Sequence, residues 1–476
     1  MPKRGKVAPS VPVFSPRAVW VLAGGVALVH FALALAFAWV TPYRTAGILI
    51  HQNGAFAADI GAPDERQHAN YVSQLVQGEG FPVFRPRSED LYETYQSHQP
   101  PAYYVVAAGW AKATGAQDVE DRGFGFRLRA LSGMLGAVAV LGVFAFVIWG
   151  FGRPIAALCA AAFAALLPMN VALSGAISND PMLFAVCSWT LALLARSLRQ
   201  GYSVRSWIGI GALLGLGLLT KTSAIALFVP ALVAVWWVSG RKVQVFALRA
   251  ALVVGLALAI VAPWWLRNTQ LYGDPLALKA FSEAFVGTAQ ASVFVDAFGA
   301  YGYWTHWVGW WTLRSSIGAF GYMDIFLPKM LYGGFAIATL LLLGKGIAGN
   351  GKPLDPAARA SVWMAVGFSA VVLLMFVRFN LQYFQGQARY LFPAMAPFAA
   401  WVGLGAESLL GSKRWVPFAL AAALASLCAY VLVLLPGEFR RRESLSPNVL
   451  QYVKPKSALD LRTVLPVRAP GDTWIC

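Results

Sequence analysis

The stretch AVWVLAGGVALVHFALALAFAWV, residues 18–40, is an uncharged apolar run of 23 residues near the start of the chain. As a helix it would be about 34 Å long, enough to cross a hydrocarbon core of about 30 Å. The basic segment MPKRGK precedes it, as in a signal peptide, but the apolar part of a cleaved signal is only about 7–15 residues long. We therefore expect residues 18–40 to remain attached as the first membrane span.

The whole chain shares this apolar character. Of its 476 residues, 58% are hydrophobic and only 12% are charged. A soluble chain of this length would form roughly three domains, but the polar residues needed to cover them are missing. We therefore predict an all-α polytopic membrane protein, a bundle of about 11 transmembrane helices. The predicted spans are residues 18–40, 130–150, 155–174, 181–198, 206–220, 222–238, 250–267, 330–344, 361–377, 391–410 and 415–435.

Charge is distributed unevenly between the segments that join these spans. All of the 21 acidic residues except Asp355 and Glu407 fall in one alternating set of segments, whereas the other set is almost purely Lys and Arg. Because basic segments stay on the cytoplasmic side, we expect a cytoplasmic N-terminus and an extracytoplasmic acidic set in an inner (plasma) membrane protein. The net charge of +17 then reflects membrane topology, and nucleic-acid binding is not expected.

Residues 1–436 are expected to form one transmembrane domain, followed by a short extracytoplasmic tail, 437–476. Two outer segments are long. The first outer loop, 41–129, holds ten carboxylates, and the second, 268–329, is rich in Trp and Tyr, which is typical of a membrane-interface helix or a lid. The apolar residues 102–111 are too few for a span, so we place them in an interfacial or re-entrant helix of the first loop.

The glycines at positions 209, 211, 215 and 217 superficially match a dinucleotide-binding loop. They lie inside a predicted span with no strand before them, which argues against a nucleotide site. The spacing of Gly211 and Gly215 instead favours close packing of two helices.

The strongest candidate for chemistry lies just beyond the first span, in Pro63-Asp64-Glu65-Arg66-Gln67-His68. Asp64 is expected near the N-terminus of a helix, where the helix dipole keeps a carboxylate ionised. If helical, Glu65 and His68 share a face. Such a carboxylate can act as a general base toward an acceptor hydroxyl or help to hold a divalent cation. The alternative is that Asp64 only caps a surface helix.

Other polar residues of the outer segments have a functional and a purely structural interpretation. His98, Tyr103 and Tyr104 belong to a segment that starts the short outer helix, where they would lie at headgroup level as ligand contacts or as interfacial anchors. Asp180 lies at a tight outer turn, where capping the next helix is the alternative role. His306, among the aromatic residues of 268–329, either contacts a ligand or packs at the interface.

Three cationic side chains, Lys221, Arg267 and Arg389, lie at outer ends of predicted spans. The helix that leads to Lys221 is only about 21 Å long, so this lysine should be sunken in the outer leaflet. Arg suits bidentate binding of phosphate. Each cation alone is as readily an anchor that snorkels to the headgroups. Together, beside a carboxylate cluster, they match a lipid-linked phosphate with chemistry next to it.

As an ordered series, these motifs resemble the GT-C superfamily of polyprenyl-phosphate-dependent glycosyltransferases, in particular bacterial relatives of protein O-mannosyltransferases and lipid A aminoarabinose transferases. The series runs from about residue 60 to residue 400, most of the chain. The matching residues are Pro63-Asp64-Glu65 with His68 and Tyr71, His98-Gln99-Pro100-Pro101-Ala102-Tyr103-Tyr104, Ser178-Asn179-Asp180, Gly217-Leu218-Leu219-Thr220-Lys221, Pro263-Trp264-Trp265-Leu266-Arg267-Asn268 with Tyr272-Gly273-Asp274-Pro275, and Gln387-Ala388-Arg389-Tyr390-Leu391-Phe392-Pro393.

The resemblance implies that Asp64, with Glu65 beside it, is the catalytic centre. It implies a polyprenyl-phosphate-linked sugar donor, an extracytoplasmic acceptor (glycan, lipid or protein) and contact with membrane lipids. The donor phosphate would be held by Lys221 and Arg389, with Arg267 and His98 nearby. The candidate substrate contacts are His68, Tyr103, Tyr104, Asp180, Tyr390 and His306. No cofactor is firmly implied, and a divalent cation (Mg²⁺ or Mn²⁺) at Asp64 and Glu65 stays open.

Inverting transfer is expected, because no second carboxylate is clearly placed as a nucleophile. The alternative is a transporter or flippase that binds the same lipid phosphate without bond chemistry, although the inverted repeats and midplane charges typical of transporters are not found in the sequence. A non-catalytic membrane scaffold is a second alternative, for which the acidic and cationic residues would be dispensable.

Overall fold

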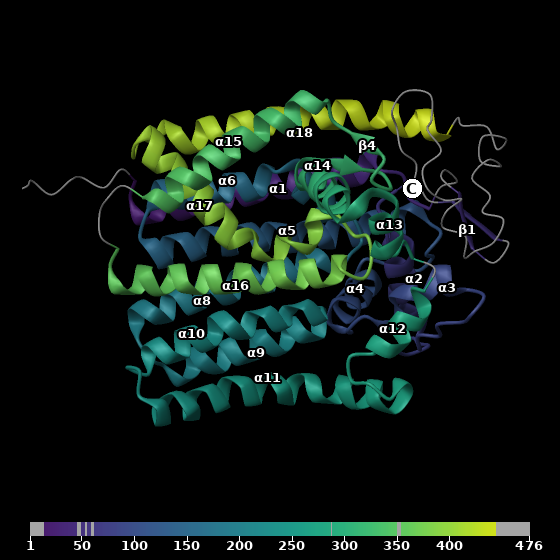
Figure 1. Cartoon of the computed structure of the whole chain (residues 1–476), viewed down its shortest axis with the longest axis horizontal. Coiled ribbons are helices and arrows are strands. Elements are labelled where there is room, and N and C mark those ends of the chain that lie inside the picture. The colour runs from purple at the N-terminus through teal and green to yellow at the C-terminus, as the bar shows by residue number, and fades with distance from the viewer. Residues whose placement is uncertain are drawn as a thin grey trace, which may run out of the picture.

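A computed structural model describes residues 14–44, 49–52, 55–58, 61–286, 288–349 and 354–443. Most of the predicted C-terminal tail, from residue 444 on, lies outside the described residues. In the described part, long helices run side by side and make an all-α bundle (Figure 1), so the predicted fold class is confirmed.

Seven helices of the described part are long and apolar enough to cross a membrane, and an eighth candidate is a bent pair. The seven are α1 (Pro16–Val40), α5 (Arg122–Phe151), α8 (Asp180–Gln200), α11 (Val243–Tyr272), α15 (Lys329–Ala348), α16 (Pro356–Asn380) and α18 (Trp415–Glu443). The pair is α6 (Pro154–Leu166) and α7 (Pro168–Ser174), bent by 62°. The chain is thus a multi-pass membrane protein.

Three predicted spans correspond to shorter helices. These are α9 (Val204–Thr220), α10 (Phe228–Val238), which follows the 3-10 turn η2 (Thr222–Leu227), and α17 (Met395–Leu410). Every predicted apolar run therefore coincides with a helix or a helix pair. Eleven membrane crossings stay a prediction, because these three helices are shorter than a full span.

Short elements gather at one end of the bundle, on the right in Figure 1. The helices there are α2 (Glu65–Gln77), α3 (Leu91–Thr94), η1 (Tyr95–His98), α4 (Ala102–Ala113), α12 (Leu278–Ala284), α13 (Ala291–Gly302), the π-helix η3 (Tyr303–Gly309) and α14 (Trp310–Ile317). The remaining short elements are η4 (Ala388–Tyr390), η5 (Phe392–Ala394) and two antiparallel hairpins, β1 (Leu49–Gln52) with β2 (Ala55–Ala58) and β3 (Ala319–Phe320) with β4 (Ile325–Phe326). Helix α4 is about 18 Å long, too short to cross a bilayer, which fits an interfacial or re-entrant position.

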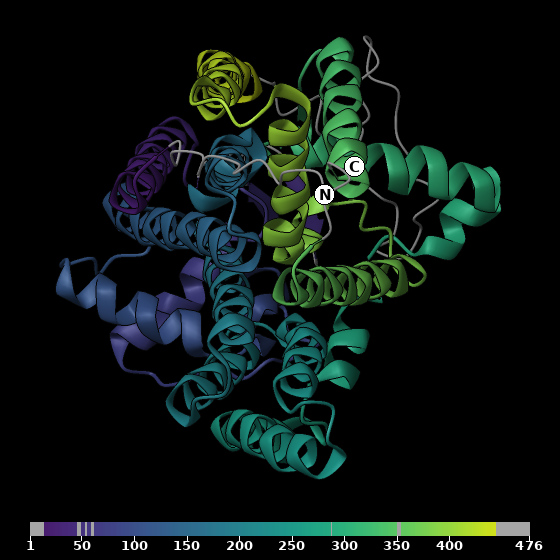
Figure 2. The same cartoon turned by 90° about the vertical axis from the view of Figure 1, so that its left-hand side faces the viewer.

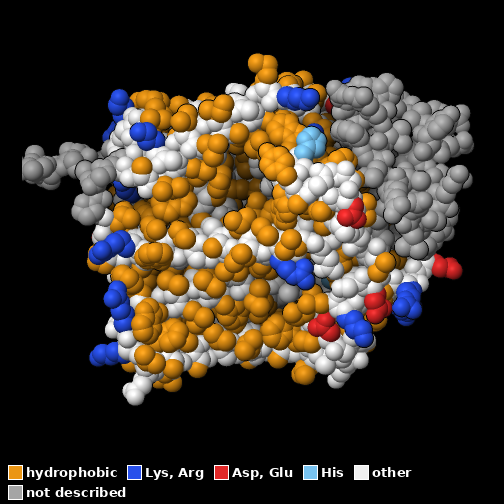
Figure 3. Space-filling view, in the orientation of Figure 1, with side chains coloured by type: hydrophobic (Ala, Val, Ile, Leu, Met, Phe, Trp, Pro, Cys, Tyr) orange, Lys and Arg blue, Asp and Glu red, His pale blue; other side chains and the backbone are white. Residues whose placement is uncertain are grey.

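The two ends of the bundle differ in charge. In Figure 3, Lys and Arg side chains line the left-hand end, whereas the Asp and Glu side chains visible in this view lie in the right-hand half, with apolar side chains between. The sequence predicted this separation, since basic and acidic segments alternate along the chain. The assignment of the basic end to the cytoplasm stays a prediction.

Close packing of the helices fixes the scaffold behind the site. The largest buried apolar cluster is built mainly on α5, α6 and α8, between α18 and α11, which lie at opposite edges of the bundle (Figure 2). Helix α17 touches α6 and α15 through glycines: a Cβ on Gly403 would lie 2.2 Å from the carbonyl of Ala156, and one on Gly405 would lie 1.8 Å from that of Leu342. Larger residues would force these helices apart.

The packing interpretation of the glycines in α9 also agrees with the structure. A Cβ on Gly211 would lie 3.0 Å from the carbonyl oxygen of Val253, and a Cβ on Gly215 would lie 2.8 Å from the Cβ of Ile260; both neighbours are on α11. These glycines let α9 and α11 approach closely, and α9 ends at the end of the bundle that carries the short elements, where it presents Lys221.

Candidate active site

Asp64 precedes α2 with backbone angles φ 65° and ψ −4°, in the left-handed region that residues other than glycine rarely adopt. Its side chain makes no capping hydrogen bond to the helix. Instead, Oδ1 accepts a hydrogen bond of 2.5 Å from the Tyr95 hydroxyl, and Oδ2 lies 2.6 Å from Nη2 of Arg389. The simple capping role considered from the sequence is therefore not what the structure shows.

The charge on Asp64 is fixed by these two partners. Burial alone would raise the pKa of its carboxyl, but the Arg389 charge and the Tyr95 hydrogen bond outweigh it and lower the pKa to about 2. About 20% of the side chain is still exposed. Asp64 is thus an ionised carboxylate that a substrate can reach.

A second ion pair lies between the start of α8 and the end of α9. Nζ of Lys221, just beyond the end of α9, donates to Oδ1 of Asp180 at 2.6 Å. The Asp180 side chain is 4% exposed and that of Lys221 is 21% exposed. Lys221 therefore turns toward a buried carboxylate and not outward to the lipid headgroups, so an anchoring role does not account for it.

His68 joins the two ion pairs into one site. It is buried on α2, and its Nδ1 lies 2.8 Å from the hydroxyl of Tyr104. Burial lowers the pKa of the imidazole to about 4, which leaves it neutral at physiological pH. The charges that act on this ring, in decreasing order, belong to Asp64, Lys221, Asp180 and Arg389. Both pairs thus lie within electrostatic reach of one neutral side chain.

Glu65 faces away from this site. Its carboxylate accepts hydrogen bonds from Nε (2.7 Å) and Nη2 (2.5 Å) of Arg129, and from the backbone N–H of Ile177 (2.9 Å). Arg129, on α5, also donates to the backbone carbonyls of Ala38, Thr41 and Pro42. Both charged side chains are almost fully buried. Glu65 therefore ties the start of α2 to α1, α5 and the turn before α8.

These contacts also bear on a divalent cation. Both oxygens of Asp64 are engaged by Tyr95 and Arg389, while those of Glu65 are engaged by Arg129 and a backbone N–H. Within the described ranges, no group of three or more His, Cys, Asp or Glu side chains is close enough together to hold a metal ion. The arrangement of Asp64 and Glu65 does not fit a cation held between them.

His98 and Arg267 form their hydrogen bonds with residues other than Asp64, Arg389, Asp180 and Lys221. Nδ1 of His98 donates to the carbonyl of Tyr95 at 2.6 Å, and the ring lies between Phe84 and Phe281. Burial lowers the pKa of His98 to about 4, so it is neutral and orients the residue that holds Asp64. Arg267 donates to the carbonyls of Phe81 and Pro82, which anchors the loop after α2.

The predicted substrate contacts fall into three groups. Tyr103 and Tyr104 are completely buried in the protein, so neither is an exposed interfacial anchor, and Tyr104 supports His68. Tyr390 lies beside Arg389, with its ring centroid 5.2 Å from the guanidinium. His306 is exposed on η3 and packs edge-on against Trp307. Tyr104 and Tyr390 contact residues of the site, and the ring of Tyr103 packs edge-on against that of His68, with ring centroids 6.5 Å apart.

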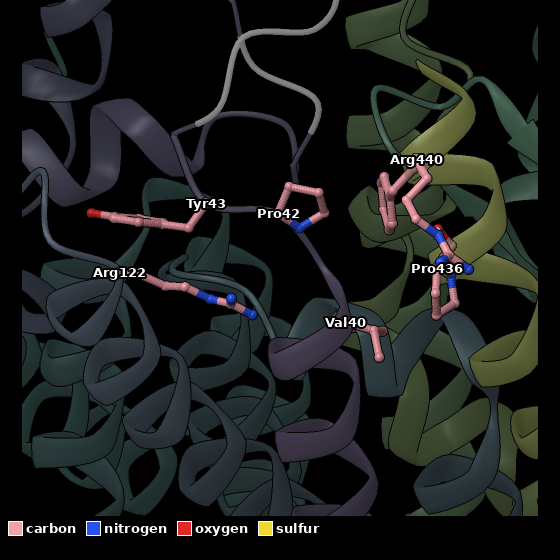
Figure 4. A pocket seen from close by; sticks show the side chains of 7 residues that line it. Val40, Pro42, Tyr43, Arg122, Pro436 and Arg440 are labelled. Carbon is pink, nitrogen blue, oxygen red and sulfur yellow. The ribbon is translucent and has the colours of Figure 1, made fainter. Parts of the chain in front are cut away.

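A hollow of about 420 Å³ lies elsewhere at this end of the bundle, between the end of α1, the start of α5 and the end of α18 (Figure 4). Its walls are Val40, Pro42, Tyr43, Arg122, Pro436, Phe439 and Arg440. Among the described residues, these walls include two arginines but no carboxylate or imidazole that could accept a proton. The hollow is therefore a weaker candidate for chemistry than the cluster at Asp64.

Two important side chains were not predicted. Tyr95, which binds Asp64, gives no periodic or charge signal in its segment. Arg129 is the last charged residue before the apolar run 130–150 and looked like a span boundary. Its five hydrogen bonds, three of them buried, show that it holds the fold around Asp64 and Glu65.

Comparisons with known proteins agree with this fold. Residues 100–266 match the family described as dolichyl-phosphate-mannose-protein mannosyltransferase. A relative, the alpha-(1->3)-arabinofuranosyltransferase of Mycobacterium tuberculosis, is 29% identical over 230 residues, 47% of this chain and 15% of the relative.

Two solved structures from Archaeoglobus fulgidus share the fold. An oligosaccharyltransferase tethered to an acceptor peptide has a TM-score of 0.52 at 14% identity, over 90% of this chain and 56% of that one. The oligosaccharyltransferase AglB, in complex with an inhibitory peptide and a dolichol-phosphate, has a TM-score of 0.50 at 12% identity, over 88% and 56%. The chain thus spans little more than half of these structures. The partial family match and the shared fold agree with the resemblance to the GT-C superfamily that the motifs predicted.

Proposed function

We propose that this protein is an integral membrane glycosyltransferase that moves a sugar from a polyprenyl-phosphate carrier to an extracytoplasmic acceptor. The observation that carries the proposal is the Asp64 carboxylate, ionised, partly exposed and held in a left-handed backbone conformation by Tyr95 and Arg389. Such strained residues persist where their surroundings hold them, and they cluster at functional sites. The mannosyltransferase family match and the dolichol-phosphate bound to AglB support a lipid-phosphate donor.

The two cations are suited to an anionic headgroup because each already binds an oxygen anion. Arg389 holds Asp64 and Lys221 holds Asp180, both at 2.6 Å. A donor phosphate that enters between the cations takes over these contacts. Arg389 then moves its charge from the carboxylate to the phosphate, and Asp64 becomes free to face the acceptor hydroxyl. The carboxylates thus occupy the phosphate-binding groups until the donor arrives.

In the transfer step, the acceptor oxygen forms a bond to the anomeric carbon of the sugar. The bond between that carbon and the phosphate oxygen breaks, and its electron pair leaves with the lipid phosphate, which Lys221 and Arg389 stabilise. The acceptor proton goes to Asp64, which acts as general base. Glu65 is held by Arg129 and is not placed as a nucleophile, so a single displacement with inversion is proposed.

The Asp64→Asn variant tests this function. Asn tolerates the left-handed conformation and can still accept the Tyr95 hydrogen bond, so the exchange removes mainly the base. We expect transfer to fall by about a hundredfold or more while the polyprenyl-phosphate donor still binds. Purified protein would be incubated with candidate polyprenyl-phosphate sugars and the products identified by mass spectrometry. Asp296→Asn, the same change at an exposed site on α13, is the matched control.

The result separates the alternatives. A flippase should tolerate the loss of this carboxylate as well as it tolerates Asp296→Asn, and a scaffold should bind no donor at all. If the folded wild-type protein transfers sugar from none of the donors, the proposed function is refuted.

A further inference from the structure

The loop that carries Arg389 is held by the aromatic segment, residues 289–317, which contains α13, η3 and α14. The two stretches form an antiparallel bridge between Gln290 and Tyr383. Within it, the Phe384 N–H donates to the Ala289 carbonyl at 2.8 Å and the Ala291 N–H donates to the Gln382 carbonyl at 3.0 Å. The aromatic segment and the loop 381–390 are therefore one hydrogen-bonded unit.

Further along the same loop, the contact becomes closer. A Cβ on Gly386 would lie 3.0 Å from Cβ of Trp311 and 3.2 Å from the carbonyl oxygens of Trp307 and Val308. The buried hydroxyl of Tyr303 donates to the carbonyl of Asn380 at 2.6 Å, at the other end of the loop. The backbone from residue 380 to residue 388 thus lies directly on η3 and α14.

Ser315 makes the last of these contacts, next to Arg389 itself. Its hydroxyl oxygen accepts a 2.8 Å hydrogen bond from the backbone N–H of Ala388, the residue that precedes Arg389. Both Ser315 and Ala388 are about 1% exposed, so water cannot replace this bond. Its loss would leave a buried N–H without a partner, which costs more than an exposed hydrogen bond does.

The guanidinium depends on this backbone. Nη2 of Arg389 reaches Oδ2 of Asp64, while Nε of Arg389 is buried and has no hydrogen-bond partner among the described residues. The ion pair with Asp64 and the position of the Arg389 Cα therefore determine where the guanidinium lies. A small shift at residue 388 would move the charge away from both the carboxylate and an incoming phosphate.

We propose that Ser315 is a positioning residue that sets Arg389 for the lipid phosphate, and that the aromatic segment acts on the site through this hydrogen bond. The proposal rests on the proposed function. It gives the aromatic segment a role beyond contact with the membrane interface, because Ser315 of this segment holds the Arg389 loop.

The neighbouring serine offers a matched control. Ser316 lies on the same helix, and its hydroxyl donates only within that helix, to the Leu313 carbonyl at 2.8 Å. Binding of undecaprenyl phosphate to the full-length protein in detergent and the donor KM and kcat would be measured for Ser315→Ala and Ser316→Ala. We expect Ser315→Ala to weaken binding about tenfold, mainly in KM, and Ser316→Ala to change it by less than about twofold.

A double variant separates positioning from general loss of stability. In an Arg389→Gln background, Ser315→Ala should change undecaprenyl phosphate binding by less than about twofold, because the group it positions is absent. Equal losses in Ser315→Ala and Ser316→Ala, or a full tenfold loss in the Arg389→Gln background, would overturn this inference alone. A folded wild-type protein that neither binds undecaprenyl phosphate nor transfers sugar would instead overturn the proposed function.

Discussion

Asp180 and the lipid phosphate are expected to compete for Lys221. Within the described residues, the lysine ammonium donates its hydrogen bond to the Asp180 carboxylate, at 2.6 Å. The Asp180→Asn exchange keeps the size and shape of the side chain but removes its charge. We therefore expect this variant to bind polyprenyl phosphate more tightly than the wild type, although the lost carboxylate belongs to the binding site.

The magnitude follows from the geometry of the pair. Two unit charges 2.6 Å apart attract by about 6 kcal/mol at an effective dielectric constant of about 20. Most of that is offset by the cost of desolvating both ions, and Lys221 is still 21% exposed to screening. We therefore expect removal of the Asp180 charge to make the free energy of phosphate binding more favourable by about 1.4 kcal/mol, which corresponds to about tenfold tighter binding.

The assay is equilibrium binding of undecaprenyl phosphate to the purified protein, with thermal unfolding as a check that each variant is folded. Asp296→Asn should bind as the wild type does, and Lys221→Met should bind about tenfold or more weakly. Weaker binding by folded Asp180→Asn would refute the reasoning, since Asp180 would then assist the phosphate and not compete with it. Unchanged binding would show that Lys221 does not reach the phosphate.

Burial lowers the pKa of His68 from 6.5 to about 4, so the contribution of this residue to stability is complete above pH 6.5 and is lost as the pH falls to 4. The His68→Gln variant should therefore show a flatter decline in melting temperature over this pH range. Arg129→Met should destabilise the protein by about 3–5 kcal/mol, because it leaves a buried carboxylate unpaired, and adding Glu65→Gln should restore most of the loss in thermal unfolding. In intact cells, a membrane-impermeant thiol reagent should label Glu79→Cys at the acidic end and not Arg205→Cys at the basic end; the opposite pattern would reverse the topology.

The fold was largely predictable, because hydropathy and loop charge act over whole segments. The eleven apolar runs match helices even where these are bent, as between α6 and α7, or continue past the expected boundary, as α5 does from Arg122. Such extensions are not visible in hydropathy, since the added turns carry charges. A periodic signal gives the existence of a helix but not where it leaves the membrane.

The candidate site was predictable where residue type was enough. Asp64, Lys221 and Arg389 are ionisable groups at membrane level, and the structure places all three in one cluster. Arg267 had the same sequence signal, but carbonyls from the distant residues 81 and 82 bind it. Only three-dimensional proximity distinguishes these arginines, because each is a cation at the end of an apolar helix. The partner of Glu65 was hidden for the same reason, as Arg129 is distant in sequence.

The backbone of Asp64 explains why two adjacent carboxylates have different environments. In a regular helix start, Asp64 and Glu65 would point to neighbouring positions, and their charges would repel or share a cation. The left-handed turn at Asp64 directs its side chain toward Tyr95 and Arg389, whereas Glu65 begins the helix and points into the protein toward Arg129. The buried Glu65–Arg129 pair holds α2 against α1 and α5, so it stabilises the strained residue next to it. In the proposed function, one carboxylate therefore supplies the reactive charge, and the other supplies the rigidity that keeps this charge in an unfavourable but productive conformation.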